Sequence, residues 1–210
     1  MYLPGHFRED DLASMHAVMR EHDFALLVAE LEGRIEAAHL PVLLDPARGE
    51  RGTLLAHMAR ANPLWRSFSS GREAIVVFQG PHAYVSPNWY ATPGSVPTWN
   101  YLAVHAYGMP RILDDERDVR ALLDRLVEVQ EHGLPKPWRA ADYPKVVDAM
   151  LPGVVAFEIP IARLEGKWKL SQNKSRADRD ALIQTFERSN DPNARAVAAA
   201  MAAREGRSSR

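Results

Sequence analysis

The stretch GPHAYVSPNWYATPGSVPTWNYLAVHAYG, residues 80–108, decides how the chain folds. It contains parts of two strand-like runs, Ile75 to Ser86 and Trp99 to Tyr107, whose aromatic and β-branched side chains suit a pleated surface. Three prolines and a glycine in the connection exclude a helix there. In the second run, side chains that alternate in direction place four rings on one face: Trp99, Tyr101, His105 and Tyr107. This aromatic face either packs against a neighbouring element or lines a pocket for a flat heterocycle.

The segments on either side of this stretch predict an α+β protein. Strand-like segments such as Phe24 to Leu31 come in runs, and the clearest helix, Asp114 to His132, is segregated from them. Because strand–helix alternation is absent, a doubly wound parallel sheet is disfavoured and an antiparallel barrel is the natural closure. We expect a single domain over residues 1–210, with a C-terminal helical extension from about 175 to 205.

The composition is that of an ordinary globular protein, with 46% hydrophobic and 25% charged residues. No apolar run is long enough for a membrane span. The absence of cysteine removes disulfides, thiolate metal sites and cysteine nucleophiles, and we expect a cytoplasmic location. A formal net charge of −1 gives no global electrostatic reason to bind nucleic acid, so such binding requires a local patch.

Two polar stretches are candidate binding sites. In TLLAHMARANPLW (53–65), His57 lies on a short strand, and Arg60 and Asn62 follow it. These residues either mark an ordinary strand end or converge with backbone N–H groups on a phosphate. Residues 163–179 carry six basic and two acidic side chains, which indicates a solvated strand end, a phosphate-binding edge or a nucleic-acid contact.

Several motifs along the chain resemble the PaiB family of FMN-binding negative transcriptional regulators, a branch of the FMN-binding split-barrel flavoproteins. The motifs are HLPVLLD (39–45), AHMARANPLW (56–65), FQGPHAYVSPNWY (78–90), VPTWNY (96–101), VHAYG (104–108) and LEGKWKLSQN (164–173). The resemblance implies a six-stranded antiparallel Greek-key split β-barrel with peripheral helices. It also implies a homodimer with FMN in a cleft at the dimer interface.

The resemblance assigns roles to residues at the matching positions. It implies that Arg60, beside His57 and Asn62, contacts the FMN phosphate and that the strand bearing His39 faces the flavin ring. It makes Lys167, Lys169, Gln172 and Asn173 candidates for phosphate, ring-edge or cross-dimer contacts. The side chains expected to wall the ring are Trp89, Tyr90 and Trp99. Flavin needs this mixture of charge, hydrogen bonds and apolar walls.

Three functions follow from these observations. The first is a homodimeric FMN-binding repressor, whose possible DNA contact is the basic patch at 163–179. The second is an FMN-dependent oxidoreductase of the pyridoxamine-phosphate-oxidase-like or flavin reductase class, with His57 or His105 in proton transfer. The third is a non-catalytic ligand or haem binder that uses His39, His57, His82 or His105, although no pair has metal-ligand spacing. We assign no catalytic residue and no metal ligand.

Overall fold

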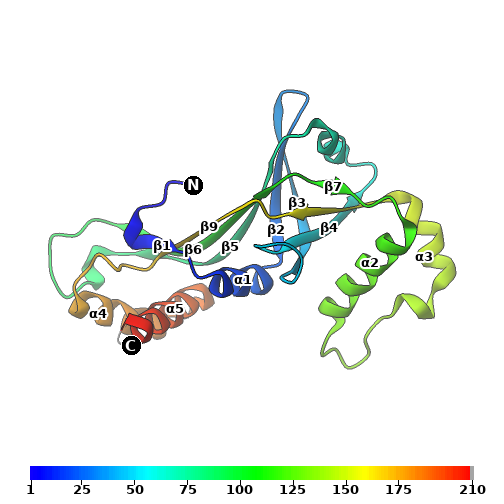
Figure 1. Ribbon diagram of the computed structural model, residues 1–210. Helices are drawn as coiled ribbons and strands as arrows, with labels where there is room; N and C mark the ends of the chain where they lie inside the picture. Colours follow the sequence, from blue (N-terminus) through cyan, green and yellow to red (C-terminus); the bar gives the residue numbers. More distant parts are fainter. Residues whose placement is uncertain (209–210) are drawn as a thin grey trace. The chain divides into compact units, whose positions relative to one another are not determined.

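The computed structural model describes residues 1–208 and shows an α+β protein with one large antiparallel sheet (Figure 1). The strands are β1 (Arg8–Glu9), β2 (Phe24–Leu31), β3 (Arg34–Asp45), β4 (Thr53–Ala59), β5 (Ala74–Val85), β6 (Thr98–Gly108), β7 (Arg111–Ile112), β8 (Val154–Pro160) and β9 (Arg163–Lys169). The α-helices are α1 (Leu12–Glu21), α2 (Glu116–Glu131), α3 (Pro144–Met150), α4 (Arg176–Glu187) and α5 (Pro192–Ser208). Short 3-10 helices are η1 (Gly5–Phe7), η2 (Pro63–Ser70), η3 (Pro87–Trp89), η4 (Ala140–Asp142) and η5 (Leu151–Gly153).

The prediction of a six-stranded closed barrel was wrong. The sheet in the described part of the chain has nine strands in the order β1-β9-β6-β5-β2-β3-β4-β8-β7, and its edge strands β1 and β7 do not pair with each other. Both edge strands have only two residues, so no side-chain alternation in the sequence could reveal them. The predicted α+β class with an antiparallel sheet is confirmed.

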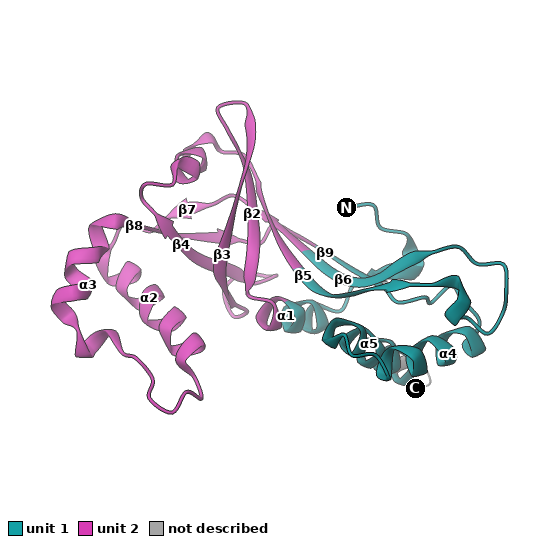
Figure 2. Cartoon of the chain, turned by 180° about the vertical axis from the view of Figure 1, so that it is seen from behind, with its two compact units in different colours: residues 1–18, 79–104, 165–210 teal, residues 19–78, 105–164 magenta. Residues whose placement is uncertain are grey.

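The chain forms two compact units, drawn in different colours in Figure 2. Unit 1 consists of Met1–Val18, Gln79–Val104 and the chain from Glu165 onward, and unit 2 consists of Met19–Phe78 and His105–Leu164. Strands β5, β6 and β9 run from one unit into the other. The one-domain organisation therefore stays a prediction.

Unit 2 is built on the paired strands β2, β3, β4 and β8, with helix α2 against them. Its β2–β3 hairpin turns at Glu32 and Gly33, whose φ angles of 52° and 78° give the left-handed conformations that a tight hairpin turn requires. Helix α2 buries one apolar stripe in a cluster made by Leu43, Leu55, Leu122, Leu126 and Ala156. Asp115 caps this helix by accepting a hydrogen bond from the Arg117 amide.

Unit 1 packs helices α4 and α5 beside its strands (Figure 2). Ser175 caps α4 by accepting a hydrogen bond from the Asp178 amide. The Asp178 carboxylate accepts hydrogen bonds from the Ser175 hydroxyl and from Thr92 in the loop between β5 and β6. These hydrogen bonds lower the pKa of Asp178 to about 2 and tie that loop to α4.

Strand β6 has the two faces that its sequence predicts. Asn100, Leu102, Val104 and Ala106 are buried, whereas Trp99 is 52% exposed and Tyr101 is half-buried. The aromatic face therefore lies toward the surface rather than in the core. None of the helices in the described part of the chain is long and apolar enough to cross a membrane.

Candidate functional site

Strand β9 in unit 1 presents two lysines on one face. Lys167 and Lys169 are two residues apart, so their side chains point the same way, and Trp168 between them is buried. Gly166 allows β1 and α1 to lie close to this strand, because an added Cβ would be 2.8 Å from the Glu9 carbonyl oxygen and from Met15 Sδ. Strand β9 and its neighbours thus fix the backbone positions from which the two lysine side chains extend.

The ammonium group of Lys167 is buried without a carboxylate partner. Lys167 is only 8% exposed, and its Nζ donates a 3.0 Å hydrogen bond to the Tyr2 carbonyl oxygen. Nζ also lies 5.5 Å from the Tyr2 ring centroid and 5.4 Å from that of Tyr101. Rings and one carbonyl stabilise the cation in part, but no acidic side chain among residues 1–208 neutralises it. A buried, unneutralised cation favours binding of an anion.

Lys169 has a similar environment. Its Nζ donates hydrogen bonds of 2.5 Å to Thr98 Oγ1 and 2.6 Å to the Trp99 carbonyl oxygen, and lies 5.9 Å from the Phe7 ring centroid. Burial, and secondarily the charge of Lys167, lower the pKa of Lys169 below its usual value. The two ammonium groups repel each other. An anion between them would relieve this repulsion and offset the cost of burying the charge of Lys169.

An exposed group of aromatic rings lies in the same unit. The Trp99 ring centroid is 5.8 Å from that of Tyr84 and 6.3 Å from that of His82, and Tyr84 meets Trp89 at 6.1 Å. Trp89 also packs edge-on against Phe186 of α4. Tyr90, by contrast, is buried, and its hydroxyl lies 3.3 Å from Ser171 Oγ. Of the three predicted ring walls, Trp99 and Trp89 therefore belong to the partly exposed aromatic group and Tyr90 does not.

The turn after β9 contains the other two predicted residues of unit 1. The Gln172 side chain closes this turn, because Oε1 accepts from the Leu170 amide and Nε2 donates to the Trp168 carbonyl. Both functional atoms of Gln172 are thus occupied by the backbone. Asn173 is exposed, and its side chain has no hydrogen-bond partner in the described part of the chain, so its amide remains available to a ligand.

The remaining four predicted residues lie in unit 2. Arg60 Nε and Nη2 donate to the carbonyl oxygens of Pro152 and Val154, at 2.8 and 2.9 Å. Asn62 caps η2 by accepting a 3.0 Å hydrogen bond from the Leu64 amide. His39 is exposed and stacks on Phe24 with ring centroids 6.0 Å apart.

His57 is the fourth residue of this group, on β4. Burial lowers the pKa of its imidazole, so the neutral form is favoured. Its Nδ1 is buried and has no hydrogen-bond partner among the side chains and backbone that the structure describes. An unpartnered buried ring nitrogen is uncommon and is a candidate for proton transfer or for a ligand contact.

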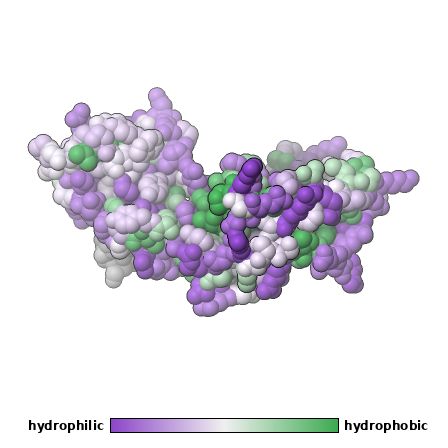
Figure 3. Space-filling view, turned by 90° about the horizontal axis from the view of Figure 1, so that it is seen from above, coloured by the Kyte–Doolittle hydropathy of each residue, from purple (hydrophilic) through white to green (hydrophobic). Residues whose placement is uncertain are grey.

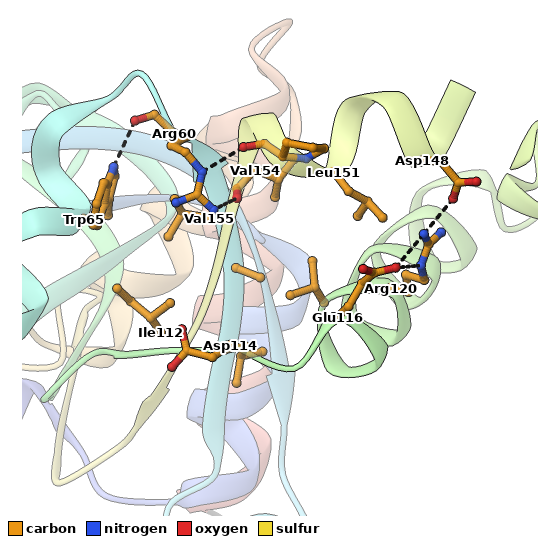
Figure 4. Close-up of a pocket in the computed structure, with 14 residues that line it drawn as sticks. Arg60, Trp65, Ile112, Asp114, Glu116, Arg120, Asp148, Leu151, Val154 and Val155 are labelled. Carbon is orange, nitrogen blue, oxygen red and sulfur yellow. Dashed lines mark hydrogen bonds and ion pairs between the residues drawn. The ribbon is translucent and has the colours of Figure 1, made fainter. Parts of the chain in front are cut away.

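Arg60 also lines a cavity of about 580 Å³ within unit 2 (Figure 4). Trp65, Ile112 and Val155 supply apolar wall, and the Trp65 indole donates to the Arg60 carbonyl oxygen. At the far side, Arg120 donates to both Glu116 and Asp148. Both arginines of this cavity therefore already have acceptors in the chain.

The sequence reasoning missed Tyr2, Phe7 and Thr98 as neighbours of the lysine pair. Tyr2 and Phe7 lie more than 150 residues before Lys167, and no local pattern links such distant positions. Tyr101 was identifiable, because the alternation of β6 placed it on the aromatic face. Among the described residues, no group of three or more histidine, cysteine, aspartate or glutamate side chains is placed to hold a metal ion.

Comparison with protein families adds to this geometry. A family model described as "Putative FMN-binding domain" matches residues 1–163. The chain is 33% identical over 202 residues to "Protease synthase and sporulation protein PAI 2" of Bacillus subtilis, with 96% of each chain covered. It is 30% identical over 227 residues to an uncharacterized protein of Emericella nidulans, which covers 89% of this chain and 90% of that protein.

Solved structures share the fold at low sequence identity. The FAD and heme binding protein from Mycobacterium smegmatis matches with a TM-score of 0.58 and 16% identity, over 77% of this chain and 73% of that chain. A conserved hypothetical protein from Mycobacterium tuberculosis matches with a TM-score of 0.58 and 9% identity, over 82% and 92% of the two chains. Likeness at this level of identity shows a common fold.

Proposed function

Because this chain belongs to the PaiB family of FMN-binding proteins, we propose that it is a homodimeric negative transcriptional regulator with FMN bound between its two copies. FMN as the cofactor rests on the family match. The observation that carries the binding proposal is the Lys167–Lys169 pair, two ammonium groups in an aromatic environment without a carboxylate partner in the described chain. We assign the FMN phosphate to this pair.

The residues of unit 1 fit the chemistry of FMN. A phosphate requires cations, the polar edge of the isoalloxazine requires hydrogen-bond donors, and its faces require apolar or aromatic walls. Lys167 and Lys169 supply the cations, Asn173 supplies a free amide, and Trp99 supplies an exposed ring. When bound, FMN supplies electron and hydride transfer. Arg60 is the alternative phosphate contact, although two of its donors are already used by backbone carbonyls.

Exposed aromatic surface supports the homodimer. Trp99 in unit 1 is 52% exposed and Phe24 in unit 2 is 67% exposed, the latter stacked on His39. Figure 3 shows hydrophobic residues at the surface among polar ones. Large exposed hydrophobic side chains that gather in patches mark interaction sites. We propose that a second copy and the flavin ring cover these side chains.

The regulatory role is supported by family membership, and direct DNA contact has little support from the basic patch at 163–179. Lys174 Nζ donates to Ser95 Oγ and lies over the Tyr90 ring, and Arg179 donates to Glu205. Arg163 lies 3.5 Å from the Tyr107 ring centroid. With the two lysines of β9, five of the six basic side chains thus contact other elements of the chain. Arg163 and Arg176 are exposed, and Arg176 pairs with Asp180 on its own helix.

Three measurements test the proposal. Titration of the purified protein with FMN, followed by quenching of flavin fluorescence, should show saturable binding that riboflavin, which lacks the phosphate, does not match. Light scattering after size exclusion should give twice the chain mass of 23.5 kDa. In a strain that lacks the gene for this protein, a reporter under a promoter that the protein represses should be expressed more strongly. A protein that is monomeric and does not bind FMN would contradict the proposal.

An FMN-dependent oxidoreductase is the second candidate function, and His57 is the observation that favours it. A neutral imidazole with an unpartnered Nδ1 can hold or pass a proton near a ligand. Steady-state oxidation of NADH or NADPH by the FMN-loaded protein would support this candidate. A His57→Gln variant with unchanged turnover would remove His57 from that role.

A further inference from the structure

A buried polar cluster joins β6 to the turn that follows the two lysines. Asn100 Nδ2 donates to Ser171 Oγ at 3.0 Å, and the same hydroxyl lies 3.1 Å from Asn100 Oδ1. The Tyr90 hydroxyl lies 3.3 Å from Ser171 Oγ. All three residues are more than nine-tenths buried, with Asn100 only 1% exposed. Buried side-chain hydrogen bonds of this kind specify one arrangement of the elements that they join.

Ser171 has an unusual backbone conformation at this point. Its φ angle is +61°, in the left-handed region that glycine adopts more readily than serine. Glycine would relieve this backbone strain but would remove the hydroxyl that Asn100 and Tyr90 contact. A strained residue that persists inside a hydrogen-bonded cluster is a feature of positions that serve a site.

The cluster adjoins the hydrogen bonds of Lys169. Lys169 Nζ contacts Thr98 and Trp99, the two residues that precede Asn100 on β6. Ser171, two residues after Lys169, contacts Asn100 itself. The chain from 169 to 171 is therefore held against residues 98–100 at both ends, with Leu170 buried between them. A shift of this turn would move the ammonium group away from both of its acceptors.

We propose that Asn100 and Ser171 are positioning residues that hold the Lys169 ammonium group in place for the phosphate of FMN. The inference rests on the proposed function, because it concerns the same phosphate site. Neither residue contacts the phosphate, and both act through the turn that carries Lys169. Without the cluster, Lys169 extends into water and its affinity for the phosphate decreases.

The cluster also affects how Lys169 titrates. The groups that face its ammonium are the Thr98 hydroxyl and Trp99 carbonyl of β6, the Phe7 ring of η1 and the charged Lys167 of its own strand. Burial lowers the pKa of Lys169, so its charge, and with it FMN affinity, is lost at lower pH than for an ordinary lysine. If the cluster is removed, hydration raises that pKa, and the loss of affinity should move to higher pH.

The test compares Asn100→Ala with Thr92→Ala, measured by FMN titration from pH 7 to pH 10. Thr92 donates to Asp178 in the same unit and does not contact Lys169, so its variant should lose stability and keep wild-type affinity. Asn100→Ala should weaken FMN binding roughly 10-fold, as expected when a charge-assisted hydrogen bond is weakened. Its affinity should also persist to higher pH, which a general loss of stability would not cause.

Ser171→Gly is the second variant, in case Asn100→Ala does not fold. Glycine accepts the left-handed backbone, so this variant removes the hydroxymethyl side chain without backbone strain. It should likewise weaken FMN binding and move the loss of affinity to higher pH. Folded variants with wild-type affinity and an unchanged pH profile would overturn the inference. Lys169→Ala separates the two proposals, because unchanged FMN affinity in that variant would show that the phosphate assignment itself is wrong.

Discussion

The protein has two groups of basic side chains that look equivalent in the sequence and differ in the structure. In unit 2, Arg60 donates to two carbonyl oxygens, and Arg120 donates to Glu116 and Asp148. In unit 1, Lys167 and Lys169 find only carbonyl and hydroxyl oxygens, and no carboxylate in the described chain neutralises them. Arg120 is therefore neutralised by carboxylates, and Arg60, which has only carbonyl acceptors, is exposed to water. Lys167 differs from both because its charge is buried as well as unneutralised.

If the lysines bind the phosphate, the surroundings of a cation, rather than its charge or sequence context, decide whether it binds a phosphate. Arg60 has the motif position expected of a phosphate contact, yet the start of β8 already uses two of its donors. Charge-assisted hydrogen bonds are strong, so an arginine that donates them to backbone carbonyls contributes to the stability of the fold. The following experiments test the comparison.

The largest effect is expected when both lysines become methionine. Lys167→Met combined with Lys169→Met should weaken FMN binding by at least about 100-fold, because each charge-assisted contact contributes roughly 1.5–3 kcal/mol. Urea unfolding should show equal or greater stability, since one buried and one half-buried charge that repel each other are removed. Flavin fluorescence titration measures the affinity, and unchanged binding would mean that the lysines are not the phosphate site.

The next effect concerns Arg60. If the lysines bind the phosphate, Arg60→Ala should leave FMN affinity near wild type and lower the free energy of unfolding by about 1–2 kcal/mol, because the Pro152 and Val154 carbonyls lose their donors. If Arg60 binds the phosphate instead, FMN affinity should fall by roughly 1.5–3 kcal/mol. Titration and urea unfolding of one variant thus distinguish the two assignments.

A smaller effect is expected from pH in the wild-type protein. The lowered pKa of Lys169 means that its charge is present at neutral pH and is lost as pH rises, below the usual range of lysine. FMN affinity should therefore decrease several-fold as the pH rises above neutral, before an ordinary lysine titrates. The decrease should disappear in Lys169→Met, and a profile that is flat to pH 10 in the wild type would contradict this expectation.

The smallest effect is expected at Arg120, the matched control from unit 2. Arg120→Met removes a cation whose two carboxylate partners are themselves largely exposed. Surface ion pairs contribute little to stability. FMN affinity and the urea midpoint should both stay within experimental error of wild type. A large loss of affinity in this variant would show that the cavity of unit 2 takes part in FMN binding.

Local patterns determined much of the secondary structure. Alternation along the strand predicted which side chains of β6 share a face, because strand geometry alone sets that direction, and the structure decided which face is buried. Ser175 was identifiable as a helix cap from its residue type and the apolar stripe that follows, whereas the sequence left Asp114 and Asp115 as alternatives for the cap of α2. The motif LEGKWKLSQN directed attention to Lys167 and Lys169, although it also suggested a ligand contact for Gln172, whose side chain closes a turn.

What the sequence determined by itself is the α+β class, the family and a short list of polar and aromatic candidates, since these depend on neighbours close in the chain. Only the tertiary structure decided that the sheet has nine strands within the described residues and remains open there, and which cations lack a carboxylate partner in that part of the chain. The acceptors of Arg60 lie more than 90 residues away, and Lys167 meets a carbonyl 165 residues before it. Contacts between residues so far apart in the chain depend on how helices and strands pack, so the spacing of residues in the sequence cannot predict them.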